Sequence, residues 1–351
     1  MILLRRAKSV VGLDLGSSVV KAVELSLLGS EPVLTGFGRA EIPPGGSLEE
    51  AVTAALATLR GRTKRCVSGV GGQSTVVRYI SMLPMTHEEL LQAVRFEADK
   101  FLPFDADEVV LDCQQLQART NHEGESDGSK IPVLVAACRR QLIEEQVEVV
   151  EQAGLLPIAV DLDLFALANA WDLCGLQEED MPQEEGAPQG AQALIDVGAS
   201  RTLINVLRGG ETCFSREIAI GGADMTQAVA RRLGVEPFEA EAIKRAGDVH
   251  EVEVGASIAP LLEDLANEIA LSIDYVEHHE GVEVSELLLS GGGSLISGMA
   301  TSIEQATTRT TRIWNPLEGL RVDAESLDVE ELEAWAPSLV VAMGLAARVR
   351  A

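Results

Sequence analysis

The chain has 351 residues, of which 55 are acidic and 28 basic, so its formal net charge is −27 at neutral pH. So negative a protein repels phosphate backbones and anionic lipid at long range, which argues against binding to nucleic acid. With 46% apolar residues it can form two or three domains, but no apolar run is long enough to span a membrane and no signal peptide is recognisable, so we expect a cytoplasmic protein.

The first 80 residues predict a mixed β-sheet with one helix. Strands are expected at residues 10–13, 19–25, 33–41 and 65–70, with a helix at residues 48–59. Because the hairpins come before the helix, the sheet should contain antiparallel as well as parallel strands.

The turn between the first two strands reads Asp14-Leu15-Gly16-Ser17-Ser18. A Gly/Ser turn presents backbone N–H groups and hydroxyls in a small concave nest, and an Asp at the strand end can hold a cation or its water shell. A single Asp-x-Gly turn is common in hairpins and is more often structural than functional.

Residues 81–157 change character and predict a compact α+β unit inserted in a larger fold. The order is a helix at residues 86–100, strands at 109–117 and 131–138, and a helix at 140–153. Thr86 followed by Glu89 resembles a capping box at the start of the first helix. Such an insertion usually carries a specific interaction. Beyond it, residues 158–190 predict a connecting helix and an acidic linker rich in Gln, Gly and Pro.

The second half of the chain has the same order of predicted elements as the first, with a hairpin before its helices. A predicted hairpin at residues 192–207 contains the turn Asp196-Val197-Gly198-Ala199-Ser200, and Gly221-Gly222 opens a helix. Helices are expected at residues 237–246 and 260–279, and a closing helix at 339–349. A third Gly/Ser turn, Gly291-Gly292-Gly293-Ser294, again follows an apolar strand.

Three strand-ending Gly/Ser turns argue for one nucleotide site assembled from both halves of the chain. Two facing hairpins with an Asp at each strand end could clamp a polyphosphate and its Mg²⁺. The sequence has neither G-x-x-x-x-G-K-[ST] nor a G-x-G-x-x-G leading from strand to helix, so the P-loop and Rossmann interpretations lack their defining turn.

These motifs resemble, in the same order, the phosphate-1, phosphate-2 and adenosine motifs of the actin, Hsp70 and sugar-kinase superfamily. The segment Glu241-Ala242-Ile243-Lys244-Arg245 resembles the E-x-x-K-R helix that packs on adenine in the Hsp70 branch. Within the superfamily the chain is most similar to the PilM family of type IV pilus assembly, over nearly its whole length. The likeness is carried by VGLDLGSSVVKAVEL at residues 11–25, Phe101-Leu102-Pro103-Phe104, Leu271-Ser272-Ile273-Asp274-Tyr275 and Met343-Gly344-Leu345-Ala346.

The resemblance implies an α/β protein with the two-lobed actin-like ATPase fold, mixed sheets and an inserted α+β subdomain of the FtsA type, named 1C. Its boundaries in this chain would be residues 1–80 for the first part of the lobe 1 core and 81–157 for the inserted subdomain. The remaining parts would be the connecting helix and linker (158–190), the lobe 2 core (191–222), a helical subdomain (223–280), and the end of lobe 2 with a closing helix that returns to lobe 1 (281–351).

The resemblance also implies a site for ATP and Mg²⁺ between the lobes. Asp14 and Asp196 would orient Mg²⁺ through water, Lys21 would neutralise phosphate charge, and no other catalytic group is assigned. The residues expected around the nucleotide are Asp14, Gly16, Ser17, Ser18, Lys21, Asp196, Gly198, Ala199, Ser200, Gly221, Gly222, Glu241, Lys244, Gly291, Gly292, Gly293 and Ser294.

Some of these residues have a structural alternative. Lys21 could point to solvent at a strand end, since lysines are mostly exposed. Glu241 and Lys244, three apart on a helix, could form a surface ion pair worth a few tenths of a kcal/mol. Phe101 and Phe104 are expected in the core of the inserted subdomain rather than at a partner.

The function implied by the resemblance is that of a cytoplasmic ATP-binding scaffold, peripheral to the inner membrane through its protein partners, needed for pilus assembly and twitching motility. It would capture the N-terminal tail of PilN in a groove beside the inserted subdomain, contact other platform proteins and the pilus motor ATPases, and form a homo-oligomer or ring. ATP hydrolysis would be slow at most.

Two alternatives remain open. A sugar kinase of this superfamily needs an acceptor pocket, which nothing in the sequence marks. A division adaptor related to FtsA would typically end in a linker and an amphipathic membrane helix, whereas this sequence ends directly after its closing helix.

Overall fold

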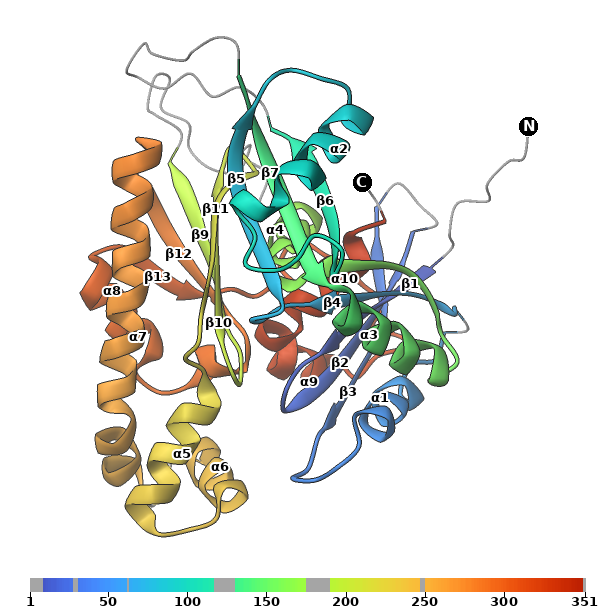
Figure 1. The fold of residues 1–351 in the computed structure, drawn as a ribbon. Helices are drawn as coiled ribbons and strands as arrows, with labels where there is room; N and C mark the ends of the chain where they lie inside the picture. The colour runs from blue at the N-terminus through green and yellow to red at the C-terminus, as the bar shows by residue number, and fades with distance from the viewer. Residues whose placement is uncertain are drawn as a thin grey trace.

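The computed structural model describes residues 9–27, 31–61, 63–116, 130–174, 190–246 and 250–349. Two lobes, each built on its own β-sheet, lie side by side, and a small third sheet sits against them (Figure 1). The acidic linker was expected at residues 177–192. Residues 177–189 of it lie outside the described residues, whereas Ala191 and Gln192 belong to a strand of lobe 2.

Lobe 1 is a six-stranded mixed sheet with the order β14-β3-β2-β1-β4-β8. Strands β1, β2 and β3 are antiparallel, whereas β4 and β8 continue the sheet in parallel. The strands are β1 (Ser9–Leu15), β2 (Val19–Ser26), β3 (Val33–Glu41), β4 (Arg65–Val70), β8 (Leu156–Leu162) and β14 (Arg321–Val322). The predicted mixed sheet is confirmed.

Lobe 2 is a five-stranded sheet with the order β11-β10-β9-β12-β13. Its central strand β9 is buried throughout except at Gln192, as a strand covered on both faces must be. The strands are β9 (Ala191–Val197), β10 (Thr202–Arg208), β11 (Glu211–Ile218), β12 (Val284–Ser290) and β13 (Thr310–Ile313).

Helices α4 (Asp163–Cys174) and α10 (Val340–Ala347) lie between the two sheets and share one core with both. Two glycines permit the close crossing of these elements. A Cβ on Gly344 would lie 1.8 Å from the carbonyl oxygen of Ala166, and one on Gly12 would lie 2.0 Å from that of Ala342. The lobes are therefore joined through tightly packed helices rather than through a single flexible strand.

The outer faces of both sheets are covered by helices that form separate cores. On lobe 1 these are α1 (Leu48–Ala57) and α3 (Arg140–Gln152), and on lobe 2 they are α5 (Gly222–Leu233), α7 (Glu251–Glu280) and α8 (Met299–Thr307). Helix α6 (Pro237–Ala246) packs against α5, and α9 (Val329–Trp335) leads towards α10.

The inserted subdomain is a three-stranded antiparallel sheet with the order β5-β7-β6, together with α2 (His87–Glu97). Its strands are β5 (Thr75–Met82), β6 (Val109–Gln115) and β7 (Ile131–Arg139). The capping box of Thr86 and Glu89 is present at the start of α2. Because β5 pairs with β7, the boundary expected after residue 80 falls inside a strand of this subdomain.

Two predicted boundaries were wrong. Residues 158–162 belong to β8 and not to the connecting helix, because the short apolar run Leu156–Leu162 pairs with β4 before α4 begins. Helix α7 begins at Glu251 rather than at Pro260 and passes through the proline. Buried Ile258 and Leu262 flank Pro260 on one helix face, and the proline is exposed, so water can reach the carbonyl that loses its partner.

Candidate functional site

The two repeated turns meet at the junction of the lobes. The first closes the β1–β2 hairpin and the second closes the β9–β10 hairpin. The hydroxyl of Ser17 donates a hydrogen bond to the hydroxyl of Ser200, with 3.1 Å between the two oxygens. The structure thus brings together two sequence motifs from opposite halves of the chain, and a hydroxyl of each turn meets the other there.

The third Gly/Ser turn packs directly behind the second. The hydroxyl of Ser290 donates to Oδ1 of Asp196 at 2.9 Å. Gly291 has a φ of +81°, and a Cβ there would lie 2.4 Å from the carbonyl oxygen of Val197, so only glycine fits this position. Gly293 also packs against Val197, and the Ser294 hydroxyl donates a hydrogen bond to the Gly291 carbonyl. The third turn therefore supports the second one.

Lys21 lies among three carboxylates. Its Nζ is 2.7 Å from Oδ2 of Asp14, the residue opposite it in the β1–β2 register. Burial alone would lower the pKa of Lys21, but the negative charges of Asp14, Asp196 and Asp163 raise it above its ordinary value. The alternative in which Lys21 points to solvent is therefore wrong. The side chain that was expected to meet phosphate holds an aspartate in this structure.

The buried carboxylates of Asp14, Asp163 and Asp196 repel one another. Burial raises the pKa of Asp196 to about 6, although the nearby Lys21 opposes that effect. Burial and the neighbouring Asp14 raise the pKa of Asp163 to about 7. Buried carboxylates that repel one another are stabilised by a cation placed between them. Within the described ranges no three His, Cys, Asp or Glu side chains converge closely enough to bind a metal directly.

Asp163 and Arg201 were missed by the sequence interpretation. Asp163 begins α4 in lobe 1 and is 7% exposed, and its Oδ2 lies 2.6 Å from Nη2 of Arg201, which follows Ser200 in lobe 2. Gly69 makes room for it, since a Cβ there would lie 2.0 Å from Oδ1 of Asp163. The sequence held one usable signal, an Asp at the end of an apolar strand, as at Asp14 and Asp196.

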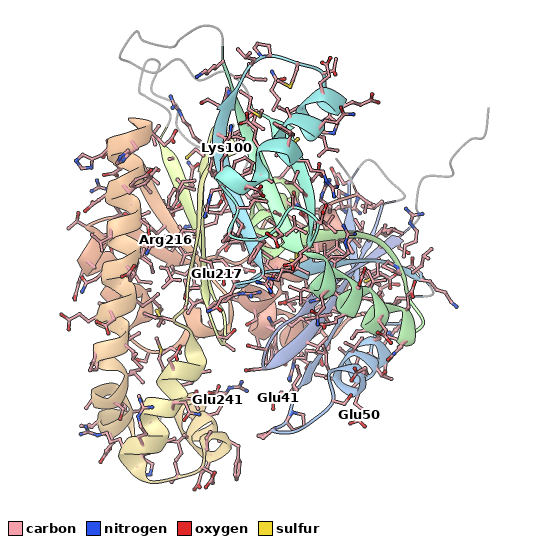
Figure 2. The ribbon with its side chains drawn as sticks, viewed as in Figure 1. Glu41, Glu50, Lys100, Arg216, Glu217 and Glu241 are labelled. Atoms are coloured by element: carbon pink, nitrogen blue, oxygen red, sulfur yellow. The ribbon has the colours of Figure 1, made fainter. Side chains whose placement is uncertain are left out.

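Lys244 and Glu241 anchor α6 to the start of α5. Nζ of Lys244 donates to the Gly222 carbonyl at 2.9 Å and to the Thr226 hydroxyl at 2.7 Å, and it pairs with Glu241 at 2.7 Å. The Lys244 side chain is only 6% exposed, so the surface-pair alternative is wrong. Next to them, Arg245 reaches across the lobes to Glu41, which is labelled in Figure 2, with 3.0 Å between Nη1 and Oε1.

The two glycines at the start of α5 connect the second hairpin turn to the Lys244 contacts. The N–H of Gly222 donates to the Gly198 carbonyl at 2.9 Å, and a Cβ on Gly221 would lie 2.5 Å from the Ala199 carbonyl oxygen. The second hairpin turn therefore contacts α5, while α5 contacts Lys244. On the lobe 1 side, a Cβ on Gly16 would lie 2.6 Å from the Val19 carbonyl oxygen, and the Ser18 carbonyl accepts from Ile42.

The arrangement suits an anionic, metal-bearing ligand. Hydroxyls and N–H groups of two turns can donate to phosphate oxygens, and the glycines allow the backbone to approach closely. The carboxylates of Asp14 and Asp196 fit the water shell of Mg²⁺, which keeps most of its waters in proteins. The residues present are thus compatible with a nucleotide and its magnesium ion.

A protein-family model described as "Type IV pilus assembly protein PilM" matches residues 12–350. Among solved structures, a chain of the "PilM-PilN type IV pilus biogenesis complex" is 28% identical, with a TM-score of 0.83 over 98% of this chain and 99% of that one. The ethanolamine utilization protein EutJ from Carboxydothermus hydrogenoformans has a TM-score of 0.53 at 15% identity, over 98% of this chain and 90% of that one, and shows the fold alone.

Two curated relatives match over shorter stretches. EutJ of Escherichia coli K12 is 31% identical over 109 residues, 30% of this chain and 35% of EutJ. The cell division protein FtsA of the same strain is 23% identical over 292 residues, 68% of this chain and 64% of FtsA. The chain thus spans about a third of EutJ and just under two thirds of FtsA. Together with the solved structures, these matches establish the predicted α/β actin-like ATPase fold.

Proposed function

Because the chain belongs to the PilM family of type IV pilus assembly proteins, we propose that it is an ATP-binding scaffold of the pilus assembly platform at the inner membrane. The observation that carries this proposal is the family match over residues 12–350, supported by a TM-score of 0.83 to a chain of the PilM-PilN complex. None of the helices in the described ranges has the length and apolar content to cross a membrane. Attachment to the platform through protein partners is part of the same proposal.

The proposed partner is the cytoplasmic N-terminal tail of PilN, bound beside the inserted subdomain. The most exposed large apolar side chain of this subdomain, within the described residues, is Phe96 on α2, at 90%, and Leu83 just before α2 is 57% exposed. Phe96 also lines a shallow, open depression together with Pro84, Met85, Glu89, Gln92 and Ala93. Phe101 and Phe104, in contrast, pack into the subdomain core. An extended tail with apolar side chains would insert one of them into this depression.

The proposed ligand between the lobes is ATP with Mg²⁺. Gly16, Ser17 and Ser18 would face the phosphates from lobe 1, and Gly198, Ala199 and Ser200 from lobe 2. Asp14 and Asp196 would hold the water shell of Mg²⁺, whose charge would relieve the repulsion between these carboxylates. Lys21, which pairs with Asp14, would offset part of this negative charge. Glu241 and Lys244 would flank the adenosine, while Gly221, Gly222 and the Gly291-Gly292-Gly293-Ser294 turn would form the walls.

Scaffolding is favoured over turnover by the state of Asp163. Burial raises its pKa to about 7, a range in which a carboxylate can act as a base, but its Oδ2 is held by Arg201. Hydrolysis would therefore be slow at most. Contacts with other platform proteins and the pilus motor ATPases, and assembly into a ring or another homo-oligomer, are further parts of this proposal.

Thermal unfolding tests the proposal, with Mg-ATP and a synthetic PilN N-terminal peptide added separately and together, alongside phosphate release. A ligand that binds only the native state raises the midpoint by mass action. We expect a higher midpoint with each ligand and almost no phosphate release. A sugar kinase would instead release phosphate or consume ATP when a polyol is added, and an adaptor of the FtsA kind would polymerise with ATP. Either result without a peptide-induced shift overturns the proposal.

A further inference from the structure

Arg201 occupies a position between three parts of the molecule. Its backbone closes the second hairpin turn, because the N–H of Gly198 donates to the Arg201 carbonyl at 2.9 Å. Its side chain crosses to lobe 1, where Nη2 lies 2.6 Å from Oδ2 of Asp163. Its Nε lies 3.8 Å from Oε2 of Glu217 on β11. One residue thus joins the turn expected to face phosphate to both lobes.

Glu217 continues this connection into the turn that starts the inserted subdomain. The side chain of Glu217 is labelled in Figure 2, and its Oε2 accepts a hydrogen bond from the backbone N–H of Gly72 at 2.9 Å. The carbonyl of Gly72 in turn accepts from the N–H and the hydroxyl of Thr75, the first residue of β5, at 2.9 Å and 2.8 Å. A continuous series of contacts therefore links Arg201 to β5, and the longest of them is the 3.8 Å ion pair between Arg201 and Glu217.

The turn before β5 is shaped around the Arg201 guanidinium. A Cβ on Gly71 would lie 2.6 Å from Nη2 of Arg201, and one on Gly72 would lie 2.9 Å from Nη1. Gly72 also has a φ of +84°, which disfavours other residues. A second contact with β11 comes from β5 itself, where the Tyr79 hydroxyl lies 3.3 Å from the Ser215 hydroxyl. The inserted subdomain thus rests on β11 at two points.

We propose that Arg201 couples occupancy of the phosphate-facing turn to the position of the inserted subdomain, so that nucleotide and partner tail alter each other's affinity. The inference rests on the proposed function, since it needs a nucleotide at the turn and a partner beside the subdomain. A phosphate seated against Gly198 and Ser200 shifts the backbone that carries Arg201. The guanidinium then changes its hold on Asp163 and Glu217, and with Glu217 the N–H of Gly72.

Thermodynamic linkage makes the coupling reciprocal. If bound nucleotide changes the affinity for the tail by some factor, then the bound tail changes the affinity for the nucleotide by the same factor. Couplings of this kind amount to roughly 5-fold to 150-fold in affinity. A purely structural Arg201 would hold the lobes together with a coupling factor of one. A coupling role and a purely structural role of Arg201 therefore differ in one quantity, the ratio of the dissociation constants of the tail without and with nucleotide. Measurements of stability do not distinguish them.

The experiment measures the dissociation constant of a fluorescent PilN N-terminal peptide with and without a saturating non-hydrolysable ATP analogue and Mg²⁺, on the full chain. We expect a ratio of about fivefold or more for the unchanged protein. Arg201→Met and Glu217→Gln should bring this ratio close to one while each ligand still binds alone. Glu217→Gln keeps the side-chain shape, so it remains informative if Arg201→Met fails to fold.

The matched control is Arg216→Met. Arg216 neighbours Glu217 on β11 but pairs with Glu268 of α7 at 2.6 Å, away from the turn before β5. This variant should keep the full ratio. A ratio that persists in both Arg201→Met and Glu217→Gln overturns the inference, as does a ratio of one in the unchanged protein that binds both ligands. If the unchanged protein binds neither ligand, the proposed function fails as well, and the two failures are thereby told apart.

Discussion

The hydroxyls of Ser17 and Ser200 lie 3.1 Å apart although 183 residues separate them along the chain. Each belongs to a hairpin turn of the same short pattern, one in each lobe. The contact places the two turns side by side at the junction of the lobes. In the proposed nucleotide complex, the phosphates between the turns would replace this hydroxyl contact.

The third turn should tolerate no side chain at Gly291. Gly291→Ala would bring a Cβ to 2.4 Å from the Val197 carbonyl oxygen at a φ of +81°. We expect the free energy of unfolding to fall by about 1–3 kcal/mol, and the midpoint shift with Mg-ATP to be lost. Urea unfolding with and without Mg-ATP measures both.

The matched control for Gly291 is Gly255→Ala in α7, where no atom lies within 4 Å of an added Cβ. Alanine should raise the free energy of unfolding there by about 0.5–1 kcal/mol, since glycine weakens a helix. Equal destabilisation by both substitutions would contradict the packing described for the third turn.

Lys244 should matter for both stability and nucleotide binding. Lys244→Met leaves Glu241 and the Gly222 carbonyl without their buried donor, so we expect a loss of about 2 kcal/mol in the free energy of unfolding. ATP affinity, measured by titration calorimetry, should fall at least about tenfold.

Glu97 and Lys100 provide the control for Lys244, because they have the same spacing of three residues and an ion-pair distance of 3.1 Å. Lys100 is exposed on the inserted subdomain (Figure 2). Lys100→Met should change stability by less than about 0.5 kcal/mol and leave ATP affinity unchanged. If Lys244→Met and Lys100→Met changed stability and ATP affinity equally, the burial of Lys244 would not matter and the prediction would be contradicted.

The apolar surface of α2 should contribute to partner binding. Phe96 is 90% exposed, so Phe96→Ala should leave folding intact and weaken peptide binding by roughly tenfold or more. Fluorescence anisotropy with the labelled PilN peptide gives the affinities. Phe238→Ala on α6, where the ring is 67% exposed, should leave peptide affinity unchanged. If only Phe238→Ala weakens binding, the tail docks on lobe 2 instead.

Stability should depend on pH through Glu24. Burial raises the pKa of Glu24, outweighing the Ser9 hydroxyl and the Gly61 N–H that lower it. A carboxyl with a raised native pKa binds its proton more tightly when folded. Its contribution is therefore complete below the ordinary value of about 4.3 and is lost as pH rises through the native pKa.

Glu24→Gln removes that titration while keeping the side-chain size. Urea unfolding between pH 4 and pH 8 should show a smaller decline in the variant than in the unchanged protein. At pH 8 the variant should be at least as stable. A steeper decline in the variant would mean that the carboxylate stabilises the fold when charged.

The parts of the site that the sequence predicted are those fixed by local chemistry. The turns at Asp14 and Asp196 follow from glycine and serine at strand ends, and the start of α5 at Gly222 follows from a glycine pair before an amphipathic helix. Such signals lie within a few residues, so they can be read without knowing which strands pair.

The parts that were missed depend on pairing between distant segments. Strand β8 passes straight into α4 without a turn residue, and its partner β4 is about ninety residues earlier, so the local sequence marks the boundary only by an Asp after an apolar strand, Asp163. Arg201 is an ordinary charged residue in the sequence, and its role follows only from the packing of lobe 2 on lobe 1.

The most direct test of the scaffold proposal is a titration of the full chain, with saturating Mg-ATP, by a labelled synthetic peptide of the PilN N-terminal tail. A scrambled peptide of the same composition serves as the control. The account predicts saturable one-to-one binding of the tail and none of the scrambled peptide. Equal binding of both peptides, or no saturable binding of the tail at concentrations up to about 1 mM, would contradict it.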